Sequence, residues 1–190
     1  MNSFPWTMRN FLGVCTAALV GISSITSAQS SGPAPVPAAR TQSDYYVPLY
    51  GGFAGISLPV GRLSDDHAAG YNLGGVVEYA VAGQQYSLRG EAEWQHFAVK
   101  SGHAGEDSNI LSLGPTIVYR LAKSPTQTFV SGGIAVYHAT GEGTRPGFNV
   151  GSGVEIPLTG FSAVAEVRLH MMLADGNPIF TLPLTVGVRF

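Results

Sequence analysis

The sequence predicts an all-β fold, an eight-stranded antiparallel up-and-down β-barrel that crosses a membrane. Three observations lead to this prediction. The chain begins with a short apolar leader, and the remainder is a series of strand-length segments separated by turn residues. Within these segments one face is uncharged and the opposite face carries the polar and ionic side chains, as expected where successive side chains of a strand point to opposite sides. Tilted strands of about 9–11 residues are long enough to cross a bilayer.

Residues 1–28 are expected to be a signal peptide. Arg9 is their only charged residue, the run FLGVCTAALVGI is apolar, and small residues lead up to Ala28, after which we expect cleavage. Signal peptides have an apolar region of about 7–15 residues, whereas a membrane-spanning helix needs about 20. The alternatives are an uncleaved anchor helix and a lipidated Cys15, which the bulky Val14 before the cysteine disfavours.

Composition restricts the function of the remaining chain. Without the leader, which holds only Arg9, nine basic residues stand against twelve acidic ones. No basic face for a nucleic-acid partner is therefore expected. Cys15 is the single cysteine, so the mature chain would have no disulfide, thiolate metal site or cysteine nucleophile. Residues 29–43, rich in Pro, Ala and Ser, predict an extended or disordered linker ahead of a barrel domain at 44–190.

The strands are predicted in order along the barrel domain. The eight segments are 46–59, 70–81, 85–99, 109–122, 127–140, 148–157, 161–173 and 179–190. Glycine pairs in the first, second and fifth segments are expected to permit tight curvature. The third, seventh and eighth segments alternate regularly between uncharged and polar residues, whereas the fifth does not reveal its facing. Each segment is longer than the usual 5–6 residues of a soluble-protein strand.

The connections alternate in length, which indicates two different rims. Residues 61–69, 100–108, 141–147 and 174–178 form long or polar connections, 82–84 and 158–160 are tight turns, and 123–126 is intermediate. Outer-membrane barrels have short turns at the periplasmic rim and longer loops outside. An even strand number returns both chain ends to the periplasmic side.

The polar faces are expected to line the barrel lumen. Five acidic and four basic residues lie on them: Glu78, Arg89, Glu91, Glu93, Arg120, Glu155, Glu166, Arg168 and Arg189. An eight-stranded barrel is only wide enough for its own side chains. Buried unpaired charges are costly, so this nearly balanced set predicts an ion-paired plug rather than an ion pathway.

The uncharged faces are expected to contact lipid. They mix large residues with Gly75, Gly90, Ala92, Ala163 and Ala165, which are too small to fill a soluble core at native density. Hydrocarbon tolerates no unpaired strand edge, so the sheet must close. Aromatic residues near strand ends predict the interfacial girdle of such barrels; they are Tyr71, Tyr79, Tyr86, Trp94, Phe129, Tyr137, Phe180 and Phe190.

The leader, the eight strands and the last residues together resemble small outer-membrane barrels of the OmpX and OmpA-transmembrane type over about residues 44–190. The final LTVGVRF, with Leu184, Val186, Val188 and Phe190 on one face, is similar to the tail that the barrel-assembly machinery recognises. The resemblance implies an outer-membrane location, with outer-membrane lipid and lipopolysaccharide as surroundings. It also implies a structural or interaction role, in envelope integrity or surface adhesion. We expect a monomer with no catalytic site, cofactor or metal.

Other functions remain as alternatives. Outer-membrane lipid A deacylases resemble this chain in fold and use a histidine with a nearby serine, but position 98 is alanine and His138 is followed only by Thr140 as a hydroxyl. His96 is expected to face lipid and His170 the lumen. A narrow pore and a soluble lipocalin-like barrel are further alternatives. The loop acids, including Asp65, Asp66 and Glu142, could bind divalent cations, although their spacing matches no known ion-binding loop.

Overall fold

The computed structural model describes residues 48–80, 84–121, 126–174 and 176–190. The predicted signal peptide 1–28, the linker 29–43 and residues 44–47 of the predicted barrel domain lie outside these ranges. In the part of the chain that is described, no helix is long and apolar enough to span a membrane.

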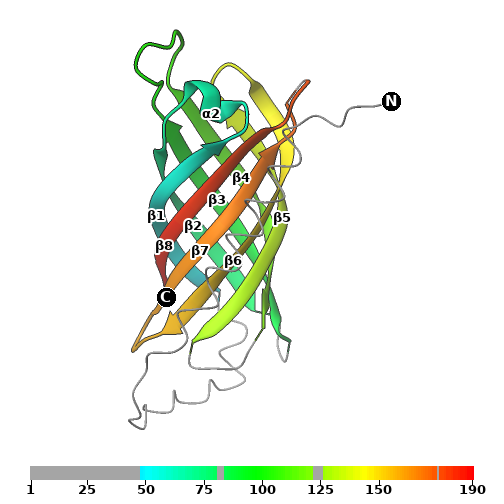
Figure 1. Cartoon of the computed structure of the whole chain (residues 1–190). Coiled ribbons are helices and arrows are strands. Elements are labelled where there is room, and N and C mark those ends of the chain that lie inside the picture. The colour runs from blue at the N-terminus through cyan, green and yellow to red at the C-terminus, as the bar shows by residue number, and fades with distance from the viewer. Residues whose placement is uncertain (1–47, 81–83, 122–125, 175) are drawn as a thin grey trace, which may run out of the picture. The chain divides into compact units, whose positions relative to one another are not determined.

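The described chain forms a closed barrel of eight strands, which confirms the predicted fold class. The strands are β1 (Leu49–Val60), β2 (Gly70–Ala80), β3 (Tyr86–Phe97), β4 (Ser108–Arg120), β5 (Gln127–Ala139), β6 (Gly143–Pro157), β7 (Ser162–Met172) and β8 (Ile179–Arg189). Each strand pairs antiparallel with the next, and β8 pairs with β1 (Figure 1). Closure leaves no unpaired sheet edge, which is the requirement for a β-structure in hydrocarbon.

The two ends of the barrel differ. The connections after β1, β3, β5 and β7 lie at one end, here called the loop end, and those after β2, β4 and β6 lie at the other, the turn end. The loop after β1 contains a short helix, α2 (Leu63–Asp66), which the sequence did not predict. The loop after β1 is hydrogen-bonded to the loop after β3 through the backbone. The N–H of Ala68 donates to the carbonyl oxygen of Ala98 at 2.9 Å, and the N–H of Lys100 donates to the carbonyl oxygen of Asp66 at 2.8 Å.

One predicted loop is wrong. Residues 141–147 were expected to be a long connection, but β6 begins at Gly143 rather than at 148. Residues 143–147 pair with Ala139 through Ala135 of β5, so only residues 140–142 remain as the connection. The local signal of two glycines and Pro146 favours a turn, and pairing with the long β5 overrides it.

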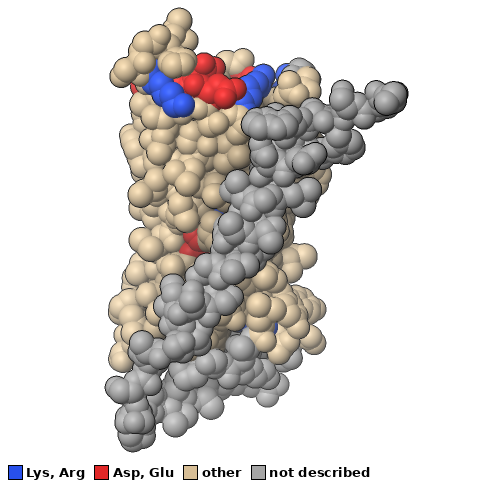
Figure 2. Space-filling view, in the orientation of Figure 1, with Lys and Arg blue, Asp and Glu red and all other residues tan. Residues whose placement is uncertain are grey.

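The uncharged faces of the strands point outward and the polar faces point into the barrel, as predicted. Large apolar residues at the middle of strands point outward, with exposures of 65 % at Leu113 and 58 % at Ile117. The small residues Gly90, Ala92 and Ala165 share this outer surface. On the face shown in Figure 2 the described part of the side wall carries little charge, and charged residues gather at the loop end. A barrel with an apolar wall and an ionic interior has the surface of a membrane-spanning protein.

Two aromatic residues of the predicted girdle do not face outward. Tyr71, Tyr79, Tyr86 and Phe190 are 43–65 % exposed near strand ends, and Trp94 and Phe180 lie on the same outward face. The prediction is wrong for Phe129 and Tyr137, which are 1 % exposed and point into the barrel.

Glycines on β6 explain why the β5 aromatic residues point inward. A Cβ atom at Gly153 would lie 2.5 Å from Cζ of Phe129, and one at Gly147 would lie 2.7 Å from Cε2 of Tyr137. Each ring therefore occupies space that the neighbouring strand leaves by having no side chain. Because both faces of β5 carry apolar residues, periodicity alone could not decide this facing, and the glycines of the next strand do.

Candidate functional site in the barrel lumen and at its mouth

All nine charged residues that the sequence placed in the lumen lie inside the barrel. Eight of them are at most 8 % exposed, and the Arg120 side chain, at the turn end, is 20 % exposed. They come from β2, β3, β4, β6, β7 and β8 and point inward because each occupies the strand register opposite the apolar face. The polar residues Asn72, Gln95, Thr116 and Asn149, which were not singled out in the sequence, share this interior.

Glu78 is the centre of the charge group nearest the turn end. Its two oxygens lie 2.6 Å from Nη2 of Arg120, 3.0 Å from Nη1 of Arg189 and 3.3 Å from Nε of Arg89. The hydroxyl of Ser87 donates a further hydrogen bond to the same carboxylate. Arg120 and Arg189 also share Glu155, each at 3.3 Å. A carboxylate that receives several charge-assisted hydrogen bonds is well compensated despite its burial.

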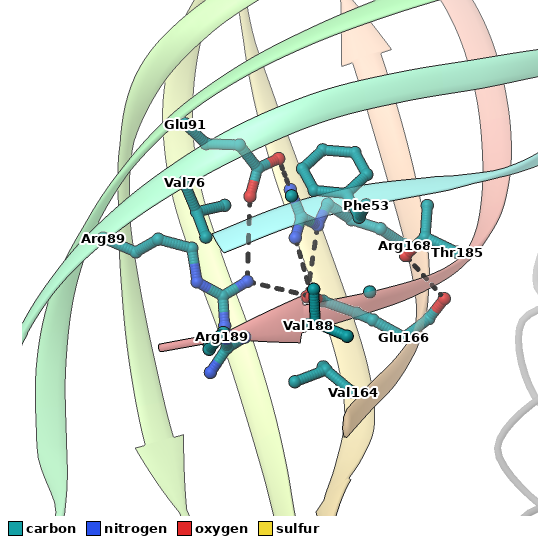
Figure 3. A pocket seen from close by; sticks show the side chains of 12 residues that line it. Phe53, Val76, Arg89, Glu91, Val164, Glu166, Arg168, Thr185, Val188 and Arg189 are labelled. Atoms are coloured by element: carbon teal, nitrogen blue, oxygen red, sulfur yellow. Dashed lines mark hydrogen bonds and ion pairs between the residues drawn. The ribbon is translucent and has the colours of Figure 1, made fainter. Parts of the chain in front are cut away.

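A second group occupies the middle of the lumen and links opposite walls. Arg89 on β3 reaches Glu166 on β7 at 2.9 Å, and Arg168 on β7 pairs with Glu166 at 2.8 Å and with Glu91 on β3 (Figure 3). Ser131 on β5 donates to Glu166 at 2.7 Å. The guanidinium groups of Arg89 and Arg189 lie 5.6 and 5.7 Å from the ring centre of Phe129, a cation–π distance.

Little free space remains among these side chains. The cavity between Arg89, Glu91, Glu166 and Arg168 has a volume of about 20 Å³ (Figure 3). A single water molecule needs roughly 10–15 Å³ by this measure. This part of the lumen is therefore nearly filled by protein, and an ion passing here would have to displace paired arginine and glutamate side chains.

An apolar cap closes the loop end above the ionic groups. It consists of Leu63, Phe97, Ile110, Ala135, Tyr137, Ala139, Met172 and Ile179. Leu63 comes from α2 and is 8 % exposed, while the other members come from the barrel wall. Leu63 was not among the predicted site residues, although it is the one large apolar residue of the segment GRLSDDHAA, and this is the signal for its role in the sequence.

A mouth cavity of about 470 Å³ opens above the cap. Its lining combines the apolar Leu63, Ala139 and Ile179 with charged loop residues, among them Asp66, Glu106 and Glu142. Arg62 bridges two loops by an ion pair to Glu142 at 2.7 Å, and Nζ of Lys100 donates to the Ser64 carbonyl at 2.6 Å. These contacts connect the loops that surround the cavity. Its volume falls within the range of about 300–1,000 Å³ of small-molecule sites.

The histidines near the rim do not assemble a catalytic set in the described part of the chain. His96 faces outward beside Tyr71, and its ring nitrogens lie 3.1 Å from Oδ1 of Asn109 and 3.8 Å from Oδ2 of Asp107, but no hydroxyl joins it. His138 contacts the Thr144 hydroxyl at 2.9 Å, rather than the Thr140 considered from sequence. No carboxylate orients His138 among the described contacts. Nucleophilic catalysis requires the hydroxyl, the base and an orienting group together.

Comparison with known proteins identifies the fold and no family. No protein-family match and no curated relative is found. Among solved structures, Neisserial surface protein A matches with a TM-score of 0.56 and 17 % identity, over 75 % of this chain and 94 % of that one. The outer membrane protein Ail of Yersinia pestis, in a phospholipid bilayer nanodisc, matches with a TM-score of 0.51 and 15 % identity, over 75 % and 99 %.

At these identities the likeness establishes architecture and leaves function open. The matching chains are covered almost from end to end, so the similarity concerns the whole barrel and not a fragment of it. The apolar outer wall, the ionic interior and the alternation of loop end and turn end agree with this result. The chain has the fold of the small eight-stranded outer-membrane β-barrels.

Proposed function

We propose that this protein is an integral outer-membrane barrel with a closed lumen, and that it acts through its loop end in envelope integrity or surface adhesion. The observation that carries the proposal is the filled lumen: paired charges span it from wall to wall, and an apolar cap seals it below the mouth. A barrel closed in this way offers the outer solution its loops and mouth cavity rather than a passage.

The outer surface of the barrel indicates which components of the envelope would contact it. Lipid acyl chains would contact the apolar wall, and the phosphates and sugars of lipopolysaccharide would adjoin the charged loop end. The aromatic residues that face outward near both ends, such as Tyr71 and Tyr79, fit the two interfaces of a bilayer. We propose that one chain is sufficient, because the barrel closes on itself.

Location and orientation are tested together by cysteine labelling of intact cells. The predicted mature chain contains no cysteine, so single substitutions report alone. Ser101→Cys lies in an exposed loop at the loop end, and Thr159→Cys is its matched control in an exposed turn at the turn end. A membrane-impermeant maleimide is expected to label Ser101→Cys in intact cells and Thr159→Cys only after lysis. Equal labelling of both, or recovery of the chain without detergent, would contradict the outer-membrane proposal.

Closure of the lumen is tested by conductance in planar bilayers. The refolded wild-type barrel is expected to leave the bilayer as insulating as the protein-free control, because an ion would have to separate buried ion pairs. Steady unitary currents from the wild-type barrel would favour the pore instead.

The two proposed roles are separated by changing the loop end alone. Residues 101–107 belong to the loop after β3, and all seven are exposed. Replacing them by a Gly/Ser segment leaves the barrel strands unchanged. A surface-adhesion role predicts loss of attachment with unchanged resistance to detergents and bile salts. An envelope-integrity role of the loop end predicts instead that this variant fails to restore the resistance of a deletion strain, which the wild type restores.

A further inference from the structure

One lumen carboxylate lies outside the arginine network. Within the described chain, Glu78, Glu91, Glu155 and Glu166 each have an arginine partner within ion-pair distance, whereas Glu93 has only the ring of His170, with Oε2 and Nε2 3.6 Å apart. Glu93 is 2 % exposed and His170 is 3 % exposed. A buried carboxylate without a counter-charge is strongly unfavourable, so this position requires a compensating cation or a proton.

The polar atoms around Glu93 are also short of partners. Glu93 Oε1, His170 Nε2, Glu91 Oε2 and Gln95 Oε1 are buried and have no hydrogen-bond partner in the described structure. Most buried polar atoms in proteins have at least one partner, and a group of exceptions at one place calls for an explanation, of which a bound ion is one. These atoms come from β3 and β7, on opposite sides of the barrel, and meet below the apolar cap.

We infer that Glu91, Glu93 and His170 form a binding site for one divalent transition-metal cation of the zinc class, buried in the lumen between the arginine network and the apolar cap. Each residue offers one ligand atom, and these atoms lie within 4.8 Å of one another. Ligand atoms around a tetrahedral zinc lie roughly 3.4 Å apart, given bonds of about 2.1 Å. The three side chains therefore have to close in by roughly an ångström around the ion.

The neighbouring groups have the arrangement that such a site needs. The side-chain amide of Gln95 lies 3.3 Å from Nδ1 of His170, on the side of the ring away from Glu93. The amide atom nearest Nδ1 is the Gln95 nitrogen Nε2. Rotation of the amide by half a turn brings its unpartnered oxygen to Nδ1–H and so selects the tautomer in which His170 Nε2 is free to bind a metal. Glu91 has one oxygen on Arg168, and its other oxygen accepts no hydrogen bond and lies 3.7 Å from Nη1 of Arg89. An imidazole with two carboxylates suits Zn²⁺ better than Ca²⁺ or Mg²⁺, which prefer oxygen ligands alone.

The apolar cap determines how the metal would enter. Tyr137 packs edge-on against His170, with ring centres 5.7 Å apart, and belongs to the cap that separates the site from the mouth. The ion would therefore be taken up as the barrel folds. For that reason the test refolds the untagged chain into detergent micelles with Zn²⁺ present, and unbound metal is then removed by gel filtration.

The experiment measures zinc per folded barrel by elemental mass spectrometry. The wild type is expected to retain about one ion, as a site formed only in the folded state does, and Glu93→Gln and His170→Gln are expected to lose it. His67→Gln, which changes the mouth cavity and leaves the lumen intact, is the matched control and should retain the ion. Heat-modifiable migration on SDS gels shows that each variant has folded.

X-ray absorption of the zinc-loaded wild type identifies the ligand atoms around the ion, and this second measurement does not depend on the folding of the variants. One imidazole nitrogen with oxygen neighbours supports the site. Absence of retained zinc, retention by both lumen variants, or a spectrum without imidazole overturns it. In those cases Glu93 is neutralised by a proton and the loops account for any bound metal.

Discussion

Arg89 on β3 and Glu166 on β7 join opposite walls of the barrel, with Nη1 of the arginine 2.9 Å from Oε2 of the glutamate. In an eight-stranded ring these strands lie four positions apart, which is the greatest separation available. Glu91 and Arg168 make a second connection between the same two strands in the reverse sense. The lumen charges thus cross-link β3 and β7, because neither strand can move outward without separating buried ion pairs.

Removing one carboxylate from the network of lumen charges is expected to destabilise the barrel strongly. Glu78→Gln leaves Arg89, Arg120 and Arg189 around a neutral side chain, and breaking a buried pair in this way costs about 3–5 kcal/mol. Glu142→Gln removes an exposed partner of Arg62 and is expected to cost less than about 1 kcal/mol. Urea titration of the barrel in liposomes measures both. Similar losses for the two variants would show that the network contributes little to stability.

A single methyl group on β6 tests the inward position of the β5 aromatic residues. In Gly153→Ala the new Cβ would meet Phe129 at 2.5 Å and the Ala165 carbonyl oxygen at 2.4 Å. Overpacking of this kind costs about 1–3 kcal/mol. Gly132→Ala on β5 is the control, since its Cβ has only one neighbour, at 3.8 Å. If the control lost as much free energy of unfolding as Gly153→Ala, the close packing of Phe129 would be refuted.

The sequence was sufficient for the architecture and for the facing of strands whose two faces differ. On β3 and β7 every charge lies on one face, so Arg89 and Glu166 could be placed in the lumen without a structure. On β5 both faces carry apolar residues, and Phe129 was misplaced because its facing depends on Gly153 of the next strand. The alternation of residues within one strand does not show how much space the glycines of the neighbouring strand leave for its side chains.

The contacts inside the lumen could not be predicted either. Glu78 receives three arginines from β3, β4 and β8, and nothing in the sequence indicates which of the nine charges are partners. The separation of Glu93 from the network arises from the same three-dimensional arrangement. The contribution of Leu63 to the apolar cap depends on the fold of the loop after β1. There the four-residue helix α2 places the Leu63 side chain among the cap residues of the barrel wall.

A positive charge in the middle of the outer wall is expected to be costly. Leu113 is 65 % exposed near the centre of β4, and Leu113→Lys should lower the free energy of unfolding in liposomes by about 2–4 kcal/mol. Leu121→Lys, just after the turn-end terminus of β4, should cost only about 0–1 kcal/mol because it lies near the interface. A depth-independent effect would indicate that this surface contacts water.

Phe190 is expected to act in assembly rather than in stability. Phe190 is 65 % exposed and contacts Phe161, with ring centres 6.2 Å apart. Phe190→Ala should reduce the amount of folded barrel in cells, while refolding of the purified chain changes little. Phe161→Ala removes the other half of the same contact and should assemble normally. Equal assembly defects in the two variants would assign the effect to the contact itself.

The most direct test of the account measures which side of the wall meets lipid. Spin labels on single cysteines along β4, in liposomes, should show oxygen accessibility with a period of two residues. The maxima should fall at Leu111, Leu113 and Ile117, which are exposed, and the minima at Ser112, Thr116 and Val118, which are buried. The opposite phase, or uniformly high accessibility to a water-soluble relaxation agent, would contradict a lipid-facing apolar wall around an ionic lumen.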